Sequence, residues 1–134
     1  YSYTLELSKN IKKASFFFPF EIENKNSNCK DDKINWNDGL AETIMKCKIV
    51  LCPSLWSAPA ESSVIKSMLL CKPVAIITTK YSASNCLYPS GTFIDLTGNI
   101  KKDTLILIGY LNDREQLKTI ANNGHSWAKK YANE

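Results

Sequence analysis

Histidine is almost absent from this sequence, and cysteine never occurs as a C-x-x-C pair. The 134 residues include one histidine, His125, and five cysteines, at 29, 47, 52, 71 and 86. Zinc sites are built from closely spaced cysteine and histidine ligands, so we expect no metal and no other cofactor. Unpaired cysteines in apolar surroundings are typical of small buried residues in a reducing compartment. We therefore expect a cytoplasmic protein, in which His125 is a surface or partly packed residue rather than a catalytic base.

The sequence also lacks a long apolar run and a cluster of charge. No run of about 18 apolar residues could span a membrane, and the first residues do not resemble a signal peptide. Contact with a membrane is therefore expected to be peripheral at most, at the cytoplasmic face. The net charge of +4 comes from scattered lysines, which does not indicate a nucleic-acid partner. Because Tyr1 is not a methionine, we expect the chain to begin partway through a longer protein.

What the sequence does contain is an alternation of apolar runs with segments of helical periodicity. Apolar residues make up 44% of the chain and charged residues 22%, as in an ordinary globular domain with one core. Helices are predicted at 3–13, 39–47, 61–70, 102–111 and 113–132, strands at 14–22, 33–36, 48–52, 72–78 and 92–96, and a loop at 23–33. Asn37 or Asp38 is expected to cap the second helix. This order predicts an α/β three-layer sandwich around a parallel sheet, with 48–52 and 72–78 in the sheet interior.

The segment CPSLWSAPAESSVIKSMLLCKPVAI, residues 52–76, holds a small polar stretch between two apolar runs. It leaves the carboxyl end of a predicted strand, where ligands bind in parallel sheets. The helix that follows would aim its free N–H groups at the ligand, which favours an anion and above all phosphate. We therefore expect residues 57–63 to wrap the start of helix 61–70 as a diphosphate-sized anion site.

Each residue of this expected site has its own part in it. Small side chains at Ser57, Ala58 and Ala60 let the backbone approach a ligand closely. The hydroxyls of Ser62 and Ser63 add hydrogen-bond donors to the free N–H groups of the first turn. Lys66 adds a positive charge one helical turn further along. Structural explanations remain open beside these roles. Serines cap helices as often as they bind phosphate, and the helix dipole alone explains Glu61. A solvated surface position explains Lys66, and core packing explains Trp56.

The segment KCKIVLCPSLWSAPAESSVIKSMLLCKPVAI resembles the signature region of retaining glycosyltransferases of the GT-B fold, the glycosyl transferases group 1 type. In that family a strand ends in Pro-Ser, an aromatic residue follows, and a loop leads into a helix and then a Gly-Lys-Pro-Val-like strand entry. The matching residues here are Pro53, Ser54, Leu55, Trp56, Pro59, Met68, Cys71, Lys72, Pro73 and Val74. The flanking segments INWNDGLAETIMKC and ANNGHSWAKKYANE also agree in order, so the resemblance covers roughly residues 30–134.

The resemblance implies a Rossmann-like domain, the carboxyl-terminal, donor-binding half of a GT-B enzyme. It would form a single domain over 1–134 that lacks its first strand, and it would need a missing amino-terminal domain to bind a glycan or lipid acceptor. The implied donor is a nucleotide sugar bound without metal, as in polysaccharide biosynthesis. The donor-binding residues would be Ser54, Ser57, Ala58, Ala60, Glu61, Ser62, Ser63 and Lys66, with Trp36 and Asn37 on the rim of the nucleotide base. The resemblance assigns no catalytic residue, and we expect the fragment alone to be inactive.

Two positions depart from the family pattern. Ala58 and Lys66 stand where the family usually carries two glutamates, of which one contacts the donor sugar and the other the ribose. An ammonium group only donates hydrogen bonds, so Lys66 would reach a phosphate or a carbonyl oxygen rather than a ribose hydroxyl. The alternative function is a non-catalytic module of the same fold, used for binding or scaffolding.

Overall fold

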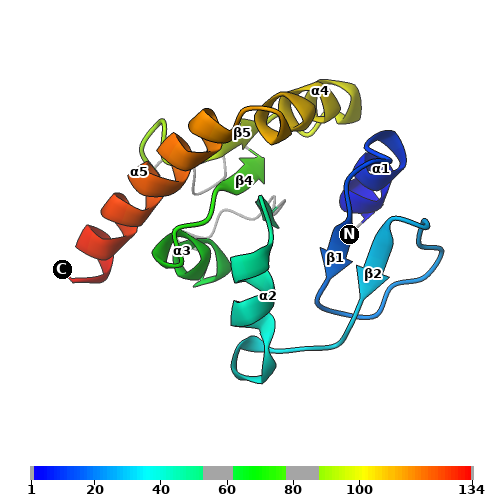
Figure 1. The fold of residues 1–134 in the computed structure, drawn as a ribbon, viewed down its shortest axis with the longest axis horizontal. Helices are drawn as coiled ribbons and strands as arrows, with labels where there is room; N and C mark the ends of the chain where they lie inside the picture. The colour runs from blue at the N-terminus through cyan, green and yellow to red at the C-terminus, as the bar shows by residue number, and fades with distance from the viewer. Residues whose placement is uncertain (1, 53–61, 78–87, 134) are drawn as a thin grey trace.

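The computed structural model describes residues 2–52, 62–77 and 88–133 (Figure 1). In this part of the chain the helices are α1 (Ser2–Asn10), the short 3-10 helix η1 (Trp36–Asp38), α2 (Leu40–Lys46), α3 (Ser62–Leu69), α4 (Ile100–Leu111) and α5 (Arg114–Ala132). The strands are β1 (Phe16–Phe18), β2 (Cys29–Asp31), β3 (Val50–Cys52), β4 (Val74–Ile77) and β5 (Ile94–Leu96). The predicted α/β class is therefore confirmed.

The described strands form two small sheets in which every pair is parallel. β1 pairs with β2, while β3, β4 and β5 form a three-stranded sheet in that order. Val50 lies opposite Val74, and Ala75 lies opposite Ile94. Figure 1 shows the β1–β2 sheet below α1, apart from β4 and β5. The parallel pairing of β3 with β4 follows from α3, which connects them, because a helical crossover returns the chain to the same end of the sheet.

The central strand β4 is covered on both faces. Val74 and Ile76 belong to an apolar cluster with Val64 and Met68 of α3 and Ala128 of α5. The residues that alternate with them, Ala75 and Ile77, belong to a second cluster with Leu7 of α1 and Leu107 of α4. All four β4 residues are buried. Side chains alternate across a strand, so a continuous apolar run such as VAII is stable only where helices cover both faces.

Helix α3 is placed against this sheet by its apolar face and by the turn that ends it. Val64 and Met68, four residues apart, are buried on one face. Cys71 then adopts a left-handed conformation with φ +60°. The amide of Cys71 donates to the Met68 carbonyl and that of Lys72 to the Ser67 carbonyl, the pattern of a Schellman cap. This cap reverses the chain directly into β4.

Helix α5 approaches α3 closely at a glycine. Gly124 is buried, and a Cβ at this position would lie 2.8 Å from the Thr92 backbone oxygen and 3.3 Å from Met68 Cγ. The helix begins with Asp113, whose carboxylate accepts from the Gln116 amide, and ends with Lys129 and Lys130 in its last turn. Both ends thus carry the charge that the helix dipole favours.

Three local predictions are wrong. Residues 33–36 were expected as a strand, but Trp36 begins the 3-10 helix η1, and the strand is Cys29–Asp31, inside the predicted loop. That strand forms because it pairs with β1 and buries Cys29 beside Phe18, a partnership that local composition does not reveal. Neither Asn37 nor Asp38 caps α2, since both lie in η1 and Gly39 occupies the cap position.

The fourth wrong prediction concerns the position of β3. It was expected in the sheet interior, but among the described strands it lies at one edge of the β3–β4–β5 sheet. Its apolar residues are nonetheless covered, because Leu51 and the preceding Ile49 pack in the same cluster as Phe16 of β1. Side-chain packing therefore explains the apolar composition of this strand without hydrogen bonds from a second neighbour.

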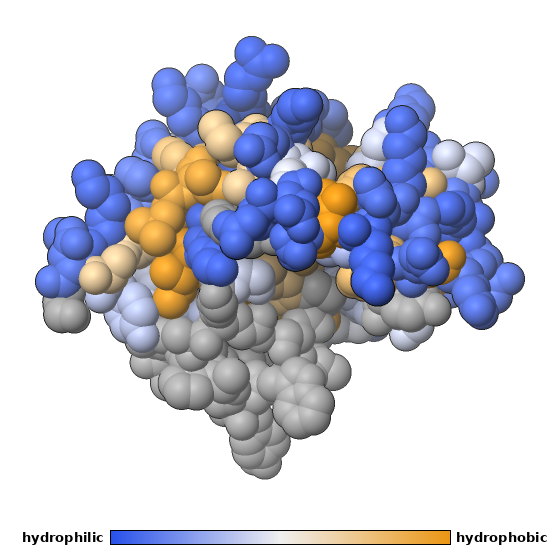
Figure 2. Space-filling model, turned by 90° about the horizontal axis from the view of Figure 1, so that it is seen from below, coloured by the Kyte–Doolittle hydropathy of each residue, from blue (hydrophilic) through white to orange (hydrophobic). Residues whose placement is uncertain are grey.

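Figure 2 shows one face of the molecule, on which the coloured residues are mostly blue and hydrophilic and are interrupted by an orange apolar patch. Among the described residues, Leu69 of α3 is 37% exposed. Within residues 2–52, 62–77 and 88–133, no helix has both the length and the apolar character needed to cross a membrane.

Candidate functional site

The candidate site lies at the carboxyl edge of the β3–β4–β5 sheet. Because the three strands are parallel, their last residues, Cys52, Ile77 and Leu96, end at the same edge. Helix α3 follows β3 in the chain and packs against β3 and β4. Its course back along the sheet places its first turn, Ser62 onward, at this carboxyl edge. That is the arrangement in which a helix N-terminus faces a ligand.

Most of the predicted donor-binding residues lie outside the residues that the structure describes. These are Ser54, Ser57, Ala58, Ala60 and Glu61, together with Trp56. The backbone of Ser62 forms the first position of α3, while its side chain also lies outside the description. The expected wrapping of residues 57–63 around the helix therefore stays a prediction.

Ser63 and Lys66 are the predicted residues whose side chains the structure places. Both are exposed, and they are three residues apart on the outer face of α3, opposite the buried Val64 and Met68. Residues at this spacing are neighbours on a helix surface. The Ser63 carbonyl accepts from Ser67 Oγ at 2.7 Å. A hydroxyl and an ammonium group thus stand on one face within the first two turns, and both can donate to an anion.

The predicted base rim does not join this group. Asn37 is exposed in η1, and Trp36 begins the same short helix. Figure 1 shows the turn that precedes α2 at the amino end of α2, and β3 lies beyond the other end of α2. The structure therefore does not bring Asn37 to the carboxyl ends of β3 and β4.

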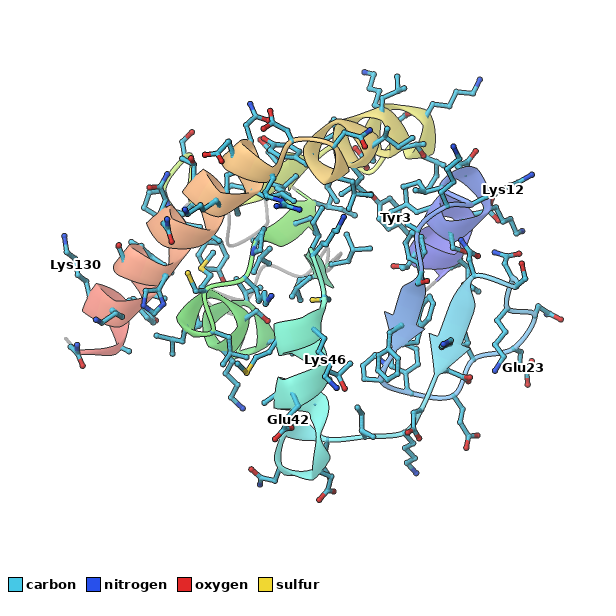
Figure 3. All side chains as sticks on the ribbon, in the orientation of Figure 1. Tyr3, Lys12, Glu23, Glu42, Lys46 and Lys130 are labelled. Atoms are coloured by element: carbon cyan, nitrogen blue, oxygen red, sulfur yellow. The ribbon has the colours of Figure 1, made fainter. Side chains whose placement is uncertain are left out.

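A buried carboxylate at the same sheet edge was missed by sequence reasoning. Asp103 of α4 is fully buried and accepts from the backbone amides of Thr97 (2.8 Å) and Gly98 (2.9 Å) and from Thr97 Oγ1 (2.8 Å). The fourth donor is the hydroxyl of Tyr3, 2.6 Å from Asp103 Oδ2. Figure 3 shows Tyr3 on the inner side of α1, opposite Lys12. Asp103 thus holds the turn after β5 and fixes α1 against α4.

The hydrogen bonds of Asp103 determine its charge state. Burial alone would raise the pKa of this carboxyl, but the donors Tyr3, Thr97 and Gly98 outweigh burial and hold the pKa below its usual range. Burial, followed by the bond to Asp103, raises the pKa of Tyr3 well above its ordinary value. The pair therefore consists of a neutral Tyr3 phenol that donates a hydrogen bond to an ionised Asp103 carboxylate. Because four hydrogen bonds satisfy the Asp103 carboxylate, the role of Asp103 is structural. A signal in the sequence was Thr97-Gly98-Asn99, a turn whose Asn99 caps α4.

His125 is partly packed, as expected. Its Nδ1 lies 3.2 Å from the Met68 carbonyl oxygen, which also accepts from the Cys71 amide in the cap of α3. This contact joins α5 to α3, away from the first turn of α3. In the described ranges, no group of three histidine, cysteine, aspartate or glutamate residues could hold a metal ion.

No protein-family model, no curated protein and no solved structure matches this chain. What indicates a function is the sequence motif, together with the position of α3 at the sheet edge.

Proposed function

We propose that this chain is the nucleotide-sugar-binding domain of a retaining GT-B glycosyltransferase, with a Rossmann-like three-layer fold. The observation that carries the proposal is the parallel β3–α3–β4 unit. It is formed by the segment that resembles the family signature, and it sets the first turn of α3 at the carboxyl edge of the sheet. The two-sided cover of β4 supports the three-layer arrangement.

The donor diphosphate is the group that this geometry suits best. The free N–H groups and the dipole of α3 attract negative charge, and the exposed Ser63 and Lys66 add donors on the outer face. In transfer, these groups would hold the diphosphate and stabilise the charge that develops on it as the bond to the sugar breaks. The acceptor, a glycan or a lipid, would be bound by a further domain. The site would work without metal, in the cytoplasm or at the cytoplasmic membrane face.

The test is titration calorimetry of the chain with UDP, GDP and ADP, for the wild type and for Lys66→Glu. A charge-assisted contact contributes about 1.5–3 kcal/mol, so the substitution should weaken nucleotide binding about tenfold or more. Lys101→Glu is the matched control, since Lys101 is an exposed lysine of α4 and the change in net charge is identical. Equal affinity of wild type and Lys66→Glu would remove Lys66 from the site.

A second candidate is a non-catalytic binding module of the same fold. Ala58 and Lys66 favour it, because they replace the two glutamates typical of the family. The same titration separates the two candidates. Binding of a nucleoside diphosphate supports the donor-binding domain, and failure of all three nucleotides to bind supports the module.

A further inference from the structure

A basic groove lies at the opposite edge of the same sheet. Its volume is about 610 Å³, within the range of roughly 300–1,000 Å³ typical of small-molecule sites. It is lined by residues just after α2, by the turn from α3 into β4, and by the α4–α5 turn with the first part of α5. We define the basic groove by its four cationic residues, Lys48, Lys72, Arg114 and Lys118. Because Lys48 and Lys72 precede β3 and β4, the groove is at the amino edge of the sheet, separate from the first turn of α3.

The charged residues that line the groove are all positive. Across the described residues, no carboxylate lines the groove and none forms an ion pair with its four cations. Cys47 also lines it. Burial raises the pKa of the Cys47 thiol, and the charge of Lys72 only partly offsets this effect. The thiol therefore stays neutral and does not cancel the positive potential.

Helix stability explains only part of this charge. Lys48 and Lys72 follow the carboxyl ends of α2 and α3, where the helix dipole favours cations. Arg114 lies in the first turn of α5, where the dipole disfavours a cation, although Asp113 and Glu115 beside it carry the favoured negative charge. Arg114 and Lys118, four residues apart, share one face of α5, the face that lines the groove. Two cations on this face, with two more on the other side of the groove, indicate a negatively charged ligand.

The remaining lining residues add an apolar wall and amide groups. Pro73, Leu111, Leu117 and Ala121 supply apolar surface. Asn122 Oδ1 accepts from the thiol of Cys71 at 3.4 Å. The amide nitrogen of Asn122 takes no part in that bond and is a further hydrogen-bond donor. Four cations, an amide and an apolar wall suit a ligand that combines several negative charges with an apolar body.

We propose that the basic groove binds an organic phosphate, a molecule with at least two negative charges next to an apolar or aromatic body. The phosphates would lie between Lys48 and Lys72 on one side and Arg114 and Lys118 on the other. The body would pack on Leu111, Leu117 and Pro73. The phosphate could belong to a soluble nucleotide or to a lipid headgroup, and the experiment distinguishes these sources.

The test compares two double variants of α5. Arg114→Gln with Lys118→Gln removes two charges from the groove, whereas Lys129→Gln with Lys130→Gln removes two from the far end of the same helix (Figure 3). All four side chains are exposed, so both variants should fold. ATP is titrated at low ionic strength with amide chemical shifts as the readout, and anionic phosphatidylglycerol vesicles are tested by co-sedimentation. Each exposed cation contributes roughly 1 kcal/mol or less to binding, so we expect the Arg114→Gln, Lys118→Gln variant to bind about tenfold more weakly than the wild type. The Lys129→Gln, Lys130→Gln control should bind as the wild type does.

Each result decides the proposal. ATP shifts at groove residues that the groove variant weakens support a soluble phosphate. Vesicle binding that only the groove variant weakens supports a lipid headgroup. The proposal is overturned if both double variants bind ATP and vesicles as the wild type does, if ATP shifts map to the first turn of α3 instead, or if neither ligand binds.

Discussion

Replacing Gly124 with alanine should destabilise the protein, although the same change usually stabilises a helix. Within a helix, alanine is about 1 kcal/mol more favourable than glycine. At Gly124 the new Cβ would lie 2.8 Å from the backbone oxygen of Thr92 and 3.3 Å from Met68 Cγ. A backbone oxygen cannot rotate away, so α5 must move off the segment before β5. Overpacking of this kind costs about 1–3 kcal/mol, so the net destabilisation after the propensity gain should reach up to about 2 kcal/mol.

Gly109 provides the matched control. It lies in α4, it is exposed, and a Cβ there would meet nothing within 4 Å. Gly109→Ala should therefore show the propensity gain alone, a stabilisation of about 1 kcal/mol. Because the chemical change is the same in both variants, its effect on the unfolded chain is similar. The difference between the two variants then isolates the contact of α5 with Thr92 and Met68.

The measurement is urea unfolding followed by circular dichroism, with thermal melting as a second readout. We expect the two variants to differ by the overpacking cost, about 1–3 kcal/mol. Each kcal/mol should change Tm by roughly a few degrees in a chain of this size. If Gly124→Ala were as stable as Gly109→Ala, α5 would not approach α3 and the segment before β5 as closely as described. The packing that positions α3 would then need another explanation.

Further predictions concern the other contacts that hold α1, α3 and α4. Tyr3→Phe should cost about 1.5 kcal/mol in urea unfolding, the lower end for a hydrogen bond to a charged group, since Asp103 keeps its other donors. Because the folded pKa of Asp103 is below its ordinary value, its contribution to stability is full above about pH 4 and is lost as the pH falls further. The cost of Tyr3→Phe should therefore be smaller at about pH 3 than at about pH 6, and an equal cost at both would show that the phenol does not favour the charged carboxylate. Met68→Ala should cost about 2–5 kcal/mol, since the side chain is fully buried and its removal leaves a cavity. A loss below 1 kcal/mol by the same assay, roughly the surface value, would contradict this burial.

The sequence alone predicted the elements whose formation depends on neighbouring residues. The run VAII of β4 could be recognised because every residue is apolar. Helix α5 could be recognised because Leu117, Ile120, Trp127 and Tyr131 give it an apolar stripe. The wrong elements were those in which a distant partner decides the outcome. Cys29–Asp31 is a strand because β1 pairs with it, and the polar residues around it gave no such signal.

The tertiary structure alone decided which distant residues meet. Tyr3 and Asp103 are separated by 100 positions in the chain, and the basic groove gathers its cations from residues 48 to 118. The sequence alone could predict an anion site at α3, which stays a proposal, because strand, loop and helix are contiguous there and their order indicates which end of the helix would face a ligand. It assigned neither the buried carboxylate nor the groove, because both depend on how separate helices pack on the sheet. Backbone and side-chain preferences act over a few residues, whereas packing joins whichever apolar faces bury each other best.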